Sequence, residues 1–299
     1  MRLQIKYIPR AFRLPFICAS ALPFIFGSLI NKGAFNFLNF LLGLSAVVAT
    51  HLSANLINDY ADAKSGADAH DRTFYGFFGG SKLIQEGKVS EKAYLQLAIF
   101  CAVAAILCVI ILSLLLRSVF VIVIYSIVIV LSWQYSQKPL RFSYRRLGEV
   151  FIFFLFGPAL VMGGYFIQAG IFPELKSFIL SVPFGLFTTA ILFANEVPDF
   201  ATDIKSGKFT WVSLIGDKNA YLFYLLLESL AFICIGLFVV LGYLKLSAFL
   251  SLVFILPVIK AAGILRRFFS DKSKLTESSK LTISVQTGVS IILILGIWL

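Results

Sequence analysis

Charged residues are scarce in this sequence: Asp, Glu, Lys and Arg together make up 14% of its 299 residues. Soluble globular chains are about a quarter charged, so the composition argues against a soluble enzyme or binding domain. Instead, 59% of the residues are hydrophobic and the mean hydropathy is +0.92. The apolar residues form long runs, and a helix that crosses a bilayer needs about 20 of them. The composition therefore indicates a polytopic integral membrane protein.

Cysteine and histidine are also rare. The four cysteines fall inside apolar runs without a CxxC pair, which excludes a disulfide framework and a zinc site of that type. The two histidines are His51 and His70. His51 precedes Asn58 by about two helical turns, where it either faces a cavity or forms a hydrogen bond within the core. We expect His70 to be solvated.

The apolar runs are continuous rather than alternating, which favours helices over a membrane β-barrel. We therefore predict an all-α fold with nine transmembrane helices in one domain, residues 1–299. The predicted spans are 15–31, 36–58, 93–116, 118–135, 148–170, 178–198, 219–242, 246–265 and 281–299.

The net charge of +11 is distributed unevenly over the predicted connections. With nine spans, 22 of the 26 Lys and Arg residues fall on one side of the membrane. The other side receives only Lys32, Arg117, Lys176 and Lys245. Basic residues accumulate on the cytoplasmic side, so the N-terminus and the long loops are predicted to be cytoplasmic, in a bacterial plasma membrane. The excess of basic residues is thus explained mainly by the orientation of the protein in the membrane and in part by binding of anionic lipid or phosphate. We do not expect nucleic acid binding.

Acidic residues are the rarest charged group, and they are clustered. The predicted loops 59–92 and 199–218 hold most of the 15 acids. Seven acids occur in two short stretches, namely Asp59, Asp62, Asp68, Asp71, Glu196, Asp199 and Asp203. A single Asp at a membrane boundary is usually a solvated helix end, but two such clusters in a chain so poor in charge indicate a site.

The spacing within each cluster suits a cation. On a helix, Asn58 and Asp62 share a face, as do Asp59 and Asp62, and Asp199 and Asp203. Clustered carboxylates repel one another unless a cation or a proton intervenes. Mg²⁺ typically takes one or two carboxylates together with phosphate oxygens. The pattern therefore predicts Mg²⁺-assisted chemistry on a diphosphate.

The two clusters also resemble each other. Each has an Asn followed by an acid, then a second acid and Lys-Ser-Gly, over residues 58–66 and 195–207. Four predicted helices separate the two copies. This similarity predicts that the fold consists of two related four-helix halves and one further helix. Each half would place its acidic cluster at the same membrane face. A chance match in an ordinary helix exit is the alternative.

These motifs resemble those of the UbiA-type intramembrane aromatic prenyltransferases, over most of the chain. The first motif is Asn58-Asp59-x-x-Asp62 with Gly66-x-Asp68, and the second is Asn195-Glu196-x-Pro198-Asp199-x-x-x-Asp203-x-x-x-Gly207-Lys208. The segment Tyr135–Glu149 also resembles the family pattern, and so does Leu14-Pro15. Ala11 replaces a proline of that pattern, which leaves open whether Arg10 or Arg13 is the equivalent arginine. The position of Asp68 is most similar to the 1,4-dihydroxy-2-naphthoate polyprenyltransferases of menaquinone synthesis. Glu196, Pro198 and Lys82 depart from the residues that are usual there.

The resemblance implies an Mg²⁺-dependent transfer of a polyprenyl group from polyprenyl diphosphate to an aromatic acceptor. The implied acceptor is 1,4-dihydroxy-2-naphthoate, with 4-hydroxybenzoate or another quinone, lipid or pigment precursor as the alternative. The implied metal ligands and catalytic groups are Asn58 together with Asp59, Asp62, Asp199 and Asp203. The implied substrate-binding residues are Arg10, Arg13, Asn58, Asp68, Lys82, Lys138, Arg141, Arg145 and Asn195.

Two other classes were weighed from the residues. CDP-alcohol phosphotransferases carry one contiguous Asp-rich motif with Asp-Gly and Ala-Arg steps, which this sequence lacks. Transporters place ionisable groups near the membrane midplane. Here the acids lie at predicted helix ends, and Glu228 is the exception within a span. A transporter is the main non-enzyme alternative, and a non-catalytic lipid-binding scaffold would not need paired acidic motifs.

Overall fold

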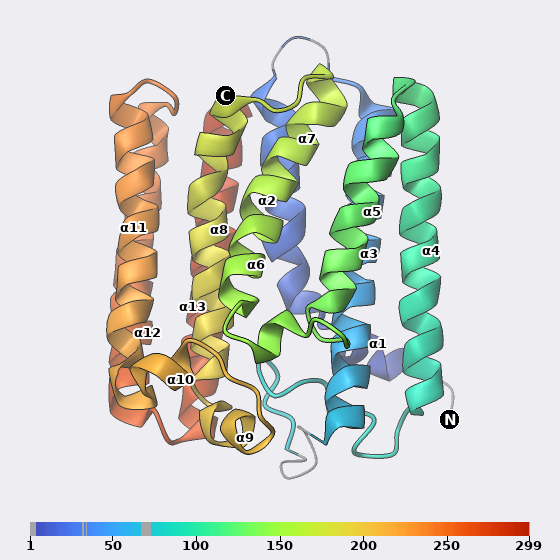
Figure 1. Cartoon of the computed structure of the whole chain (residues 1–299). Coiled ribbons are helices and arrows are strands. Elements are labelled where there is room, and N and C mark those ends of the chain that lie inside the picture. The colour runs from blue at the N-terminus through green and yellow to red at the C-terminus, as the bar shows by residue number, and fades with distance from the viewer. Residues whose placement is uncertain (1–3, 32, 34, 67–72, 299) are drawn as a thin grey trace.

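The computed structural model describes residues 4–31, 33, 35–66 and 73–298, and these form a bundle of helices (Figure 1). Asp68 and His70 therefore lie outside the described residues. The helices are α1 (Ile8–Ala11), α2 (Ile17–Ile30), α3 (Phe37–Ser65), α4 (Glu91–Leu116), α5 (Val119–Gln134), α6 (Gly148–Phe154), α7 (Leu160–Ala169), α8 (Leu175–Glu196), α9 (Phe200–Lys205), α10 (Val212–Ile215), α11 (Ala220–Val240), α12 (Ile255–Phe268) and α13 (Lys272–Trp298). Shorter helical turns are η1 (Ile5–Tyr7), η2 (Leu14–Phe16), η3 (Phe142–Tyr144), the π-helical η4 (Leu155–Ala159), η5 (Asp217–Asn219) and η6 (Leu246–Phe254).

The all-α membrane fold is confirmed, but the count of nine spans is not. Each predicted span contains a helix. Within the described residues, seven helices are long and apolar enough to cross a membrane. The number is eight if the pair Ile5–Ala11 and Leu14–Ile30, bent by 44°, forms one span. Helix α5 is apolar but has only 16 residues, which is short for a full crossing. The prediction of two related four-helix halves stays a prediction.

Helix α3 is longer than predicted, and this moves the first acidic cluster onto a helix. It begins after Asn36, whose side chain accepts a hydrogen bond from the backbone N–H of Asn39. It ends at Ser65, because Gly66 adopts a left-handed conformation with φ of 76°. The predicted acidic loop 59–92 was therefore wrong at its start, since Asp59 and Asp62 belong to the last turns of α3.

Two glycines bring α2 and α7 into direct backbone contact. A Cβ atom on Gly27 would lie 2.1 Å from the carbonyl oxygen of Val161, and one on Gly164 would lie 2.4 Å from that of Phe24. Small residues allow this close approach in membrane helices, where tight packing holds helices together. The two helices are thus fixed against each other beside the cavities described below.

One end of the bundle is closed by connections and short helices. In Figure 1, α1, α9, α10 and residues 73–90, which precede α4, all lie at the end where the N-terminus lies. The backbone N–H of Arg146 donates to the carbonyl oxygen of Phe209 at 2.8 Å, which joins the connection after α5 to the one after α9. Both acidic clusters are at this end, as the sequence predicted.

Candidate active site

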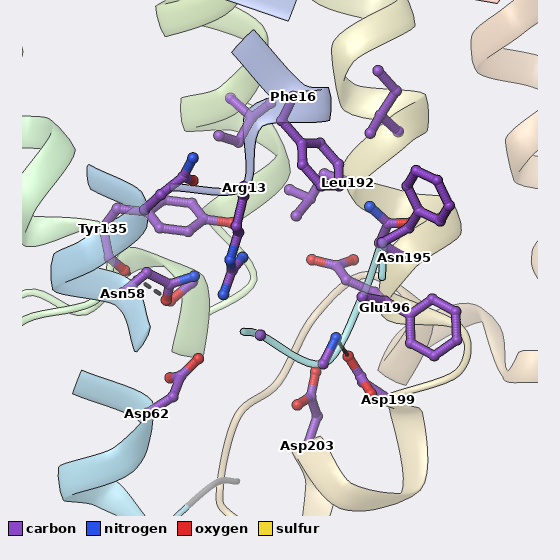
Figure 2. A pocket seen from close by; sticks show the side chains of 18 of the residues that line it. Arg13, Phe16, Asn58, Asp62, Tyr135, Leu192, Asn195, Glu196, Asp199 and Asp203 are labelled. Atoms are coloured by element: carbon purple, nitrogen blue, oxygen red, sulfur yellow. Dashed lines mark hydrogen bonds between the residues drawn. The ribbon is translucent and has the colours of Figure 1, made fainter. Parts of the chain in front are cut away.

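A polar cavity of about 190 Å³ lies at this end of the bundle. Its wall combines residues from α3, α8, α9 and the connection after α3 with Lys272 at the start of α13. Figure 2 shows Asn58 and Asp62 on one side of it and Asp199 and Asp203 on the other. Residues more than 130 positions apart in the sequence are therefore brought together around one space.

The α3 side of the cavity is held by neutral hydroxyl groups. The Ser136 hydroxyl donates to Asn58 Oδ1 at 2.8 Å, and the Tyr144 hydroxyl donates to Asp62 Oδ1 at 2.9 Å. Burial and the nearby Asp62 carboxylate raise the pKa of Tyr144 to about 12, so this hydroxyl keeps its proton at neutral pH. These contacts orient Asn58 and Asp62 without neutralising the charge of Asp62.

The α8–α9 side is held by cations. Helix α8 ends at Glu196, and Asp199 immediately precedes α9. The Asp199 carboxylate accepts the backbone N–H of Gly79 at 3.0 Å, and Lys272 Nζ lies 3.4 Å from its other oxygen. Lys208 Nζ lies 3.3 Å from Asp203 Oδ2. Asp199 and Asp203 therefore each have a lysine partner.

Asp203 is the more buried of these two acids. Burial raises its pKa to about 7, although Lys208 acts in the opposite direction by favouring the ionised carboxylate. A divalent cation at this position would favour the ionised form further. The negative charge of the ionised Asp203 carboxylate is thus only partly compensated by Lys208.

Asp59 faces away from this cavity. Its carboxylate forms an ion pair with Arg13 and accepts the backbone N–H of Ser81 at 3.2 Å. Asp59 is only 3% exposed and does not line the cavity, whereas Asn58 and Asp62 do. In this structure Asp59 fixes Arg13 and the connection between α3 and α4, and Arg13 itself reaches the cavity wall.

Only some of the predicted basic residues line the cavity. Arg13 and Lys82 do, and Lys82 is buried with a left-handed φ of 56°. Arg10 instead binds the connection after α3: its Nε donates to the Ser81 carbonyl oxygen at 2.5 Å, and its guanidinium pairs with Glu86. The structure thus distinguishes between Arg10 and Arg13, which the sequence left open.

The basic residues that follow α5 lie outside the cavity wall. Arg145 donates to the carbonyl oxygen of Pro139 at 3.1 Å, and the Arg141 guanidinium lies 3.6 Å from the ring centre of Tyr144. Lys138 is exposed and precedes Pro139. Arg141 nonetheless contacts Tyr144, whose hydroxyl donates to Asp62, so this segment supports the site indirectly.

Three lining residues were not assigned a role from the sequence. Lys208 is the last residue of the second motif, and that membership is the signal that could have indicated it. Lys272 lies 73 residues from its partner Asp199, and no local pattern indicates that pairing. Tyr135 opens the segment that matched the family pattern, and it lines the cavity too. The predicted residue Asn195 also lines the cavity, and its amide oxygen is buried without a hydrogen-bond partner among the described residues.

The donor set fits Mg²⁺ bound together with a phosphate ligand. Within the described part of the chain, no three His, Cys, Asp or Glu residues are close enough to form a protein-only metal site. The available groups are hard oxygen donors: Asn58 and Asp62 on one wall, and Asp199 and Asp203 on the other. Mg²⁺ commonly uses one or two carboxylates and takes its remaining oxygens from water and phosphate.

A second, mostly apolar cavity of about 200 Å³ extends between α2, α3, α5 and the α6–α7 region. It adjoins the polar cavity, because both are lined by the same six residues. These are His51, Asn55, Asn58, Tyr135, Ile152 and Phe156. At its far end lie Gly43, Phe24 and Ile167. A charged chamber at the end of the bundle is therefore joined to an apolar one among the helices.

The sequence and the fold of this helical bundle have counterparts in known proteins. Residues 20–285 match the UbiA prenyltransferase family, and the chain belongs to that family. A solved UbiA homologue from Aeropyrum pernix has the same fold, with a TM-score of 0.72 at 18% identity, over 92% of this chain and 96% of the homologue. The Archaeoglobus fulgidus homologue bound to DMAPP and Mg²⁺ gives a TM-score of 0.57 at 13% identity, over 95% of this chain and 98% of the homologue.

Two curated relatives show higher sequence identity over shorter regions. The 1,4-dihydroxy-2-naphthoate octaprenyltransferase of Mycobacterium tuberculosis is 29% identical over 184 residues, which cover 62% of this chain and 60% of the relative. The human UbiA prenyltransferase domain-containing protein 1 is 32% identical over 185 residues, covering 60% of this chain and 51% of the relative. The chain thus spans only about half to three fifths of the length of these two relatives.

Proposed function

We propose that this protein transfers a polyprenyl group from polyprenyl diphosphate to an aromatic acceptor in an Mg²⁺-dependent reaction. The observation that carries the proposal is the junction of the two cavities. A polyprenyl diphosphate has a highly charged head and a long apolar tail. The acid- and lysine-lined cavity suits the head with its cations, and the apolar cavity suits the tail.

The head group would be held by both acidic clusters. Asn58, Asp62, Asp199 and Asp203 would bind Mg²⁺, directly or through water, while Asp59 supports the site through Arg13. When bound, Mg²⁺ supplies positive charge to the diphosphate oxygens and so makes the diphosphate a better leaving group. Arg13, Lys82 and Lys272 line the same cavity and would stabilise the remaining negative charge.

The chain's own residues would also shape the reacting end of the donor. The bond between the allylic carbon and the diphosphate oxygen breaks, and its electron pair leaves with the diphosphate. The acceptor ring forms a new carbon–carbon bond and then loses the proton or carboxylate from the carbon that attacked. Aromatic faces stabilise a neighbouring cation. Tyr135 and Phe156 line both cavities, where the allylic carbon would lie.

We propose 1,4-dihydroxy-2-naphthoate as the acceptor, which would place the enzyme in menaquinone synthesis. The spacing of the first motif and relatives such as the Mycobacterium tuberculosis octaprenyltransferase support this choice. The similarity to UbiA prenyltransferase domain-containing protein 1 keeps another acceptor, or 4-hydroxybenzoate, as the alternative. The distribution of basic residues supports a plasma-membrane location with the polar cavity on the cytoplasmic side.

The test uses the full chain in isolated membranes or in nanodiscs. Octaprenyl diphosphate would be supplied with Mg²⁺ and, in separate reactions, 1,4-dihydroxy-2-naphthoate, 4-hydroxybenzoate or homogentisate. We expect prenylated product with the naphthoate, and none when EDTA exceeds Mg²⁺. Product from 4-hydroxybenzoate or homogentisate alone would overturn the acceptor assignment. Absence of product with every acceptor, or full activity in excess EDTA, would overturn the reaction itself.

The apolar cavity gives a separate test of where the donor tail lies. A Cβ atom at Gly43 would lie 2.5 Å from Phe24 Cζ and 2.8 Å from Ile167 Cδ1. A larger side chain at this position therefore displaces Phe24 and Ile167, both of which line the cavity, and so changes the shape of its far end. We expect Gly43→Leu to transfer geranyl groups normally but octaprenyl groups about tenfold less efficiently, the size of effect that a few methylenes have in a pocket. An unchanged ratio of the two donors in kcat/KM would place the tail elsewhere.

A further inference from the structure

His51 occupies the junction between the two cavities, and none of the roles described above uses it. It lies on α3 and lines both the polar and the apolar cavity. The residue is 8% exposed, and the ring of Phe156 meets its imidazole edge-on at a centroid distance of 5.3 Å. A buried hydrogen-bonding group in such surroundings is costly unless it has a partner.

Ser20 is the hydrogen-bond partner of one ring nitrogen of His51. The Ser20 oxygen lies 2.7 Å from His51 Nδ1 and 3.1 Å from the carbonyl oxygen of Ile17, to which the hydroxyl can donate. A serine hydroxyl has a single hydrogen, so when that hydrogen is donated to Ile17, the oxygen is the acceptor toward the imidazole. In this tautomer, Nδ1 carries the hydrogen and donates it to Ser20.

This arrangement leaves Nε2 as an acceptor. In a neutral imidazole with hydrogen on Nδ1, the lone pair is on Nε2. Among the described residues, no hydrogen bond to Nε2 is formed, and the side chain lines both cavities. The protein thus presents an oriented acceptor at the junction of the two cavities, which suits a ligand that brings a hydroxyl group.

The position of His51 along α3 is suited to contact with the aromatic acceptor rather than with the diphosphate. His51 lies seven residues before Asn58, which is about 10 Å along a helix with a rise of 1.5 Å per residue. The diphosphate would be bound at the Asn58 end, with the allylic carbon deeper at the junction. A ring system between that carbon and His51 would span this length. A carboxylate or phosphate would not donate to Nε2, whereas a phenolic hydroxyl would.

We infer, on the basis of the proposed function, that His51 Nε2 accepts a hydrogen bond from a ring hydroxyl of the aromatic acceptor. The contact would fix the ring in the junction. It would also increase the electron density of the hydroxyl oxygen, and through it that of the ring carbon that attacks. Ser20 would act as a positioning residue, since it holds the tautomer that leaves Nε2 able to accept.

The test pairs removal of the histidine with removal of the ligand hydroxyl. Inhibition constants would be measured for 1-hydroxy-2-naphthoate, 4-hydroxy-2-naphthoate and 2-naphthoate, as competitors of 1,4-dihydroxy-2-naphthoate. In the unaltered protein, we expect loss of the contacting hydroxyl to weaken binding about tenfold, the scale of one hydrogen bond. In His51→Phe this difference should disappear, while KM for the prenyl diphosphate stays within about twofold.

Three further variants separate this role from simple packing. His51→Gln retains an acceptor oxygen and should recover part of the hydroxyl preference. Ser20→Ala should lower the preference about threefold, because the tautomer is no longer held. Ser53→Ala removes another buried α3 hydroxyl, which donates to the carbonyl oxygen of Ala98 and lines neither cavity, and should leave the preference unchanged.

The outcomes distinguish this inference from the proposed function. If the unaltered protein prenylates the naphthoate but His51→Phe keeps the full hydroxyl preference, the role of His51 is wrong and the proposed function stands. Loss of donor binding in His51→Phe, with no recovery in His51→Gln, would show a packing role only and would also overturn the inference. If no hydroxyaromatic compound is prenylated, the proposed function fails, and this inference fails with it.

Discussion

The two acidic clusters have similar sequences but different partners. On α3, Asn58 and Asp62 are held by the hydroxyls of Ser136 and Tyr144, which leave the negative charge in place. On the α8–α9 side, Asp199 and Asp203 pair with Lys272 and Lys208. Within the first cluster, Asp59 pairs with Arg13, whereas Asp62 is held by a neutral hydroxyl and offers its negative charge to a cation. The second combines carboxylate with ammonium groups that can also contact phosphate.

The largest expected effect comes from the acids themselves. Asp62→Asn and Asp199→Asn keep the size of each side chain but remove its charge. We expect each to lower prenyl transfer by at least about 100-fold, the scale on which a missing electrostatic contact to a reacting group slows catalysis. Extra Mg²⁺ should partly restore Asp62→Asn, because Asp62 is held by a tyrosine hydroxyl rather than by a lysine, but not Asp199→Asn.

The matched control for these variants is Glu277→Gln, which alters an exposed acid that pairs with Lys260 and is not part of the cavity wall. It should retain normal transfer. Product formation at a series of Mg²⁺ concentrations gives the measurement. If both acidic variants respond equally to extra Mg²⁺, the two clusters do not differ in the way their partners suggest.

A smaller effect is expected from the cationic partner of the second cluster. Lys272→Met removes an ammonium group that lies 3.4 Å from Asp199 and lines the cavity. We expect the KM for the prenyl diphosphate to rise roughly 10-fold, within the range seen when groups that support a metal site are lost. Lys274→Met, an exposed lysine two residues further on, is the control and should behave like the unaltered protein. A change confined to the Mg²⁺ requirement would contradict a phosphate-binding role.

The smallest effect is expected from the neutral partner of the first cluster. Tyr144→Phe removes the hydroxyl that donates to Asp62 at 2.9 Å. Since Asp62 keeps its charge, we expect only a few-fold rise in the Mg²⁺ concentration needed for half-maximal rate, near the lower end of the effects of supporting residues. KM for the donor should not change. Tyr243→Phe, an exposed tyrosine outside both cavity walls, serves as the control. A raised donor KM in Tyr144→Phe would remove the distinction between the clusters.

Local periodicity predicted the parts of the site that depend on one helix. The pairing of Asn58 with Asp62 follows from the helical repeat, and so does that of Asp199 with Asp203. The same rule also pairs Asp59 with Asp62, and sequence alone does not distinguish these faces. Asp59 is turned away because Arg13 and the Ser81 backbone bind it, and those contacts come from distant segments.

Long-range contacts were correspondingly difficult to predict. Apolar runs located a helix in every predicted span, because hydropathy is a local property, but the end of α3 was placed too early. The apolar run stops near residue 58, whereas the helix continues as a polar segment until Gly66. The role of Lys272 depends on where α13 begins beside α9, which no pattern around residue 272 indicates.

The close contact of α2 with α7 has a consequence for redesign. Their backbones meet at Gly27 and Gly164 without room for even a methyl group, and both helices border the apolar cavity. Such a frame does not widen when a bulkier substrate arrives. Directed evolution toward new donors or acceptors should therefore vary the side chains on the cavity wall and leave these two glycines untouched.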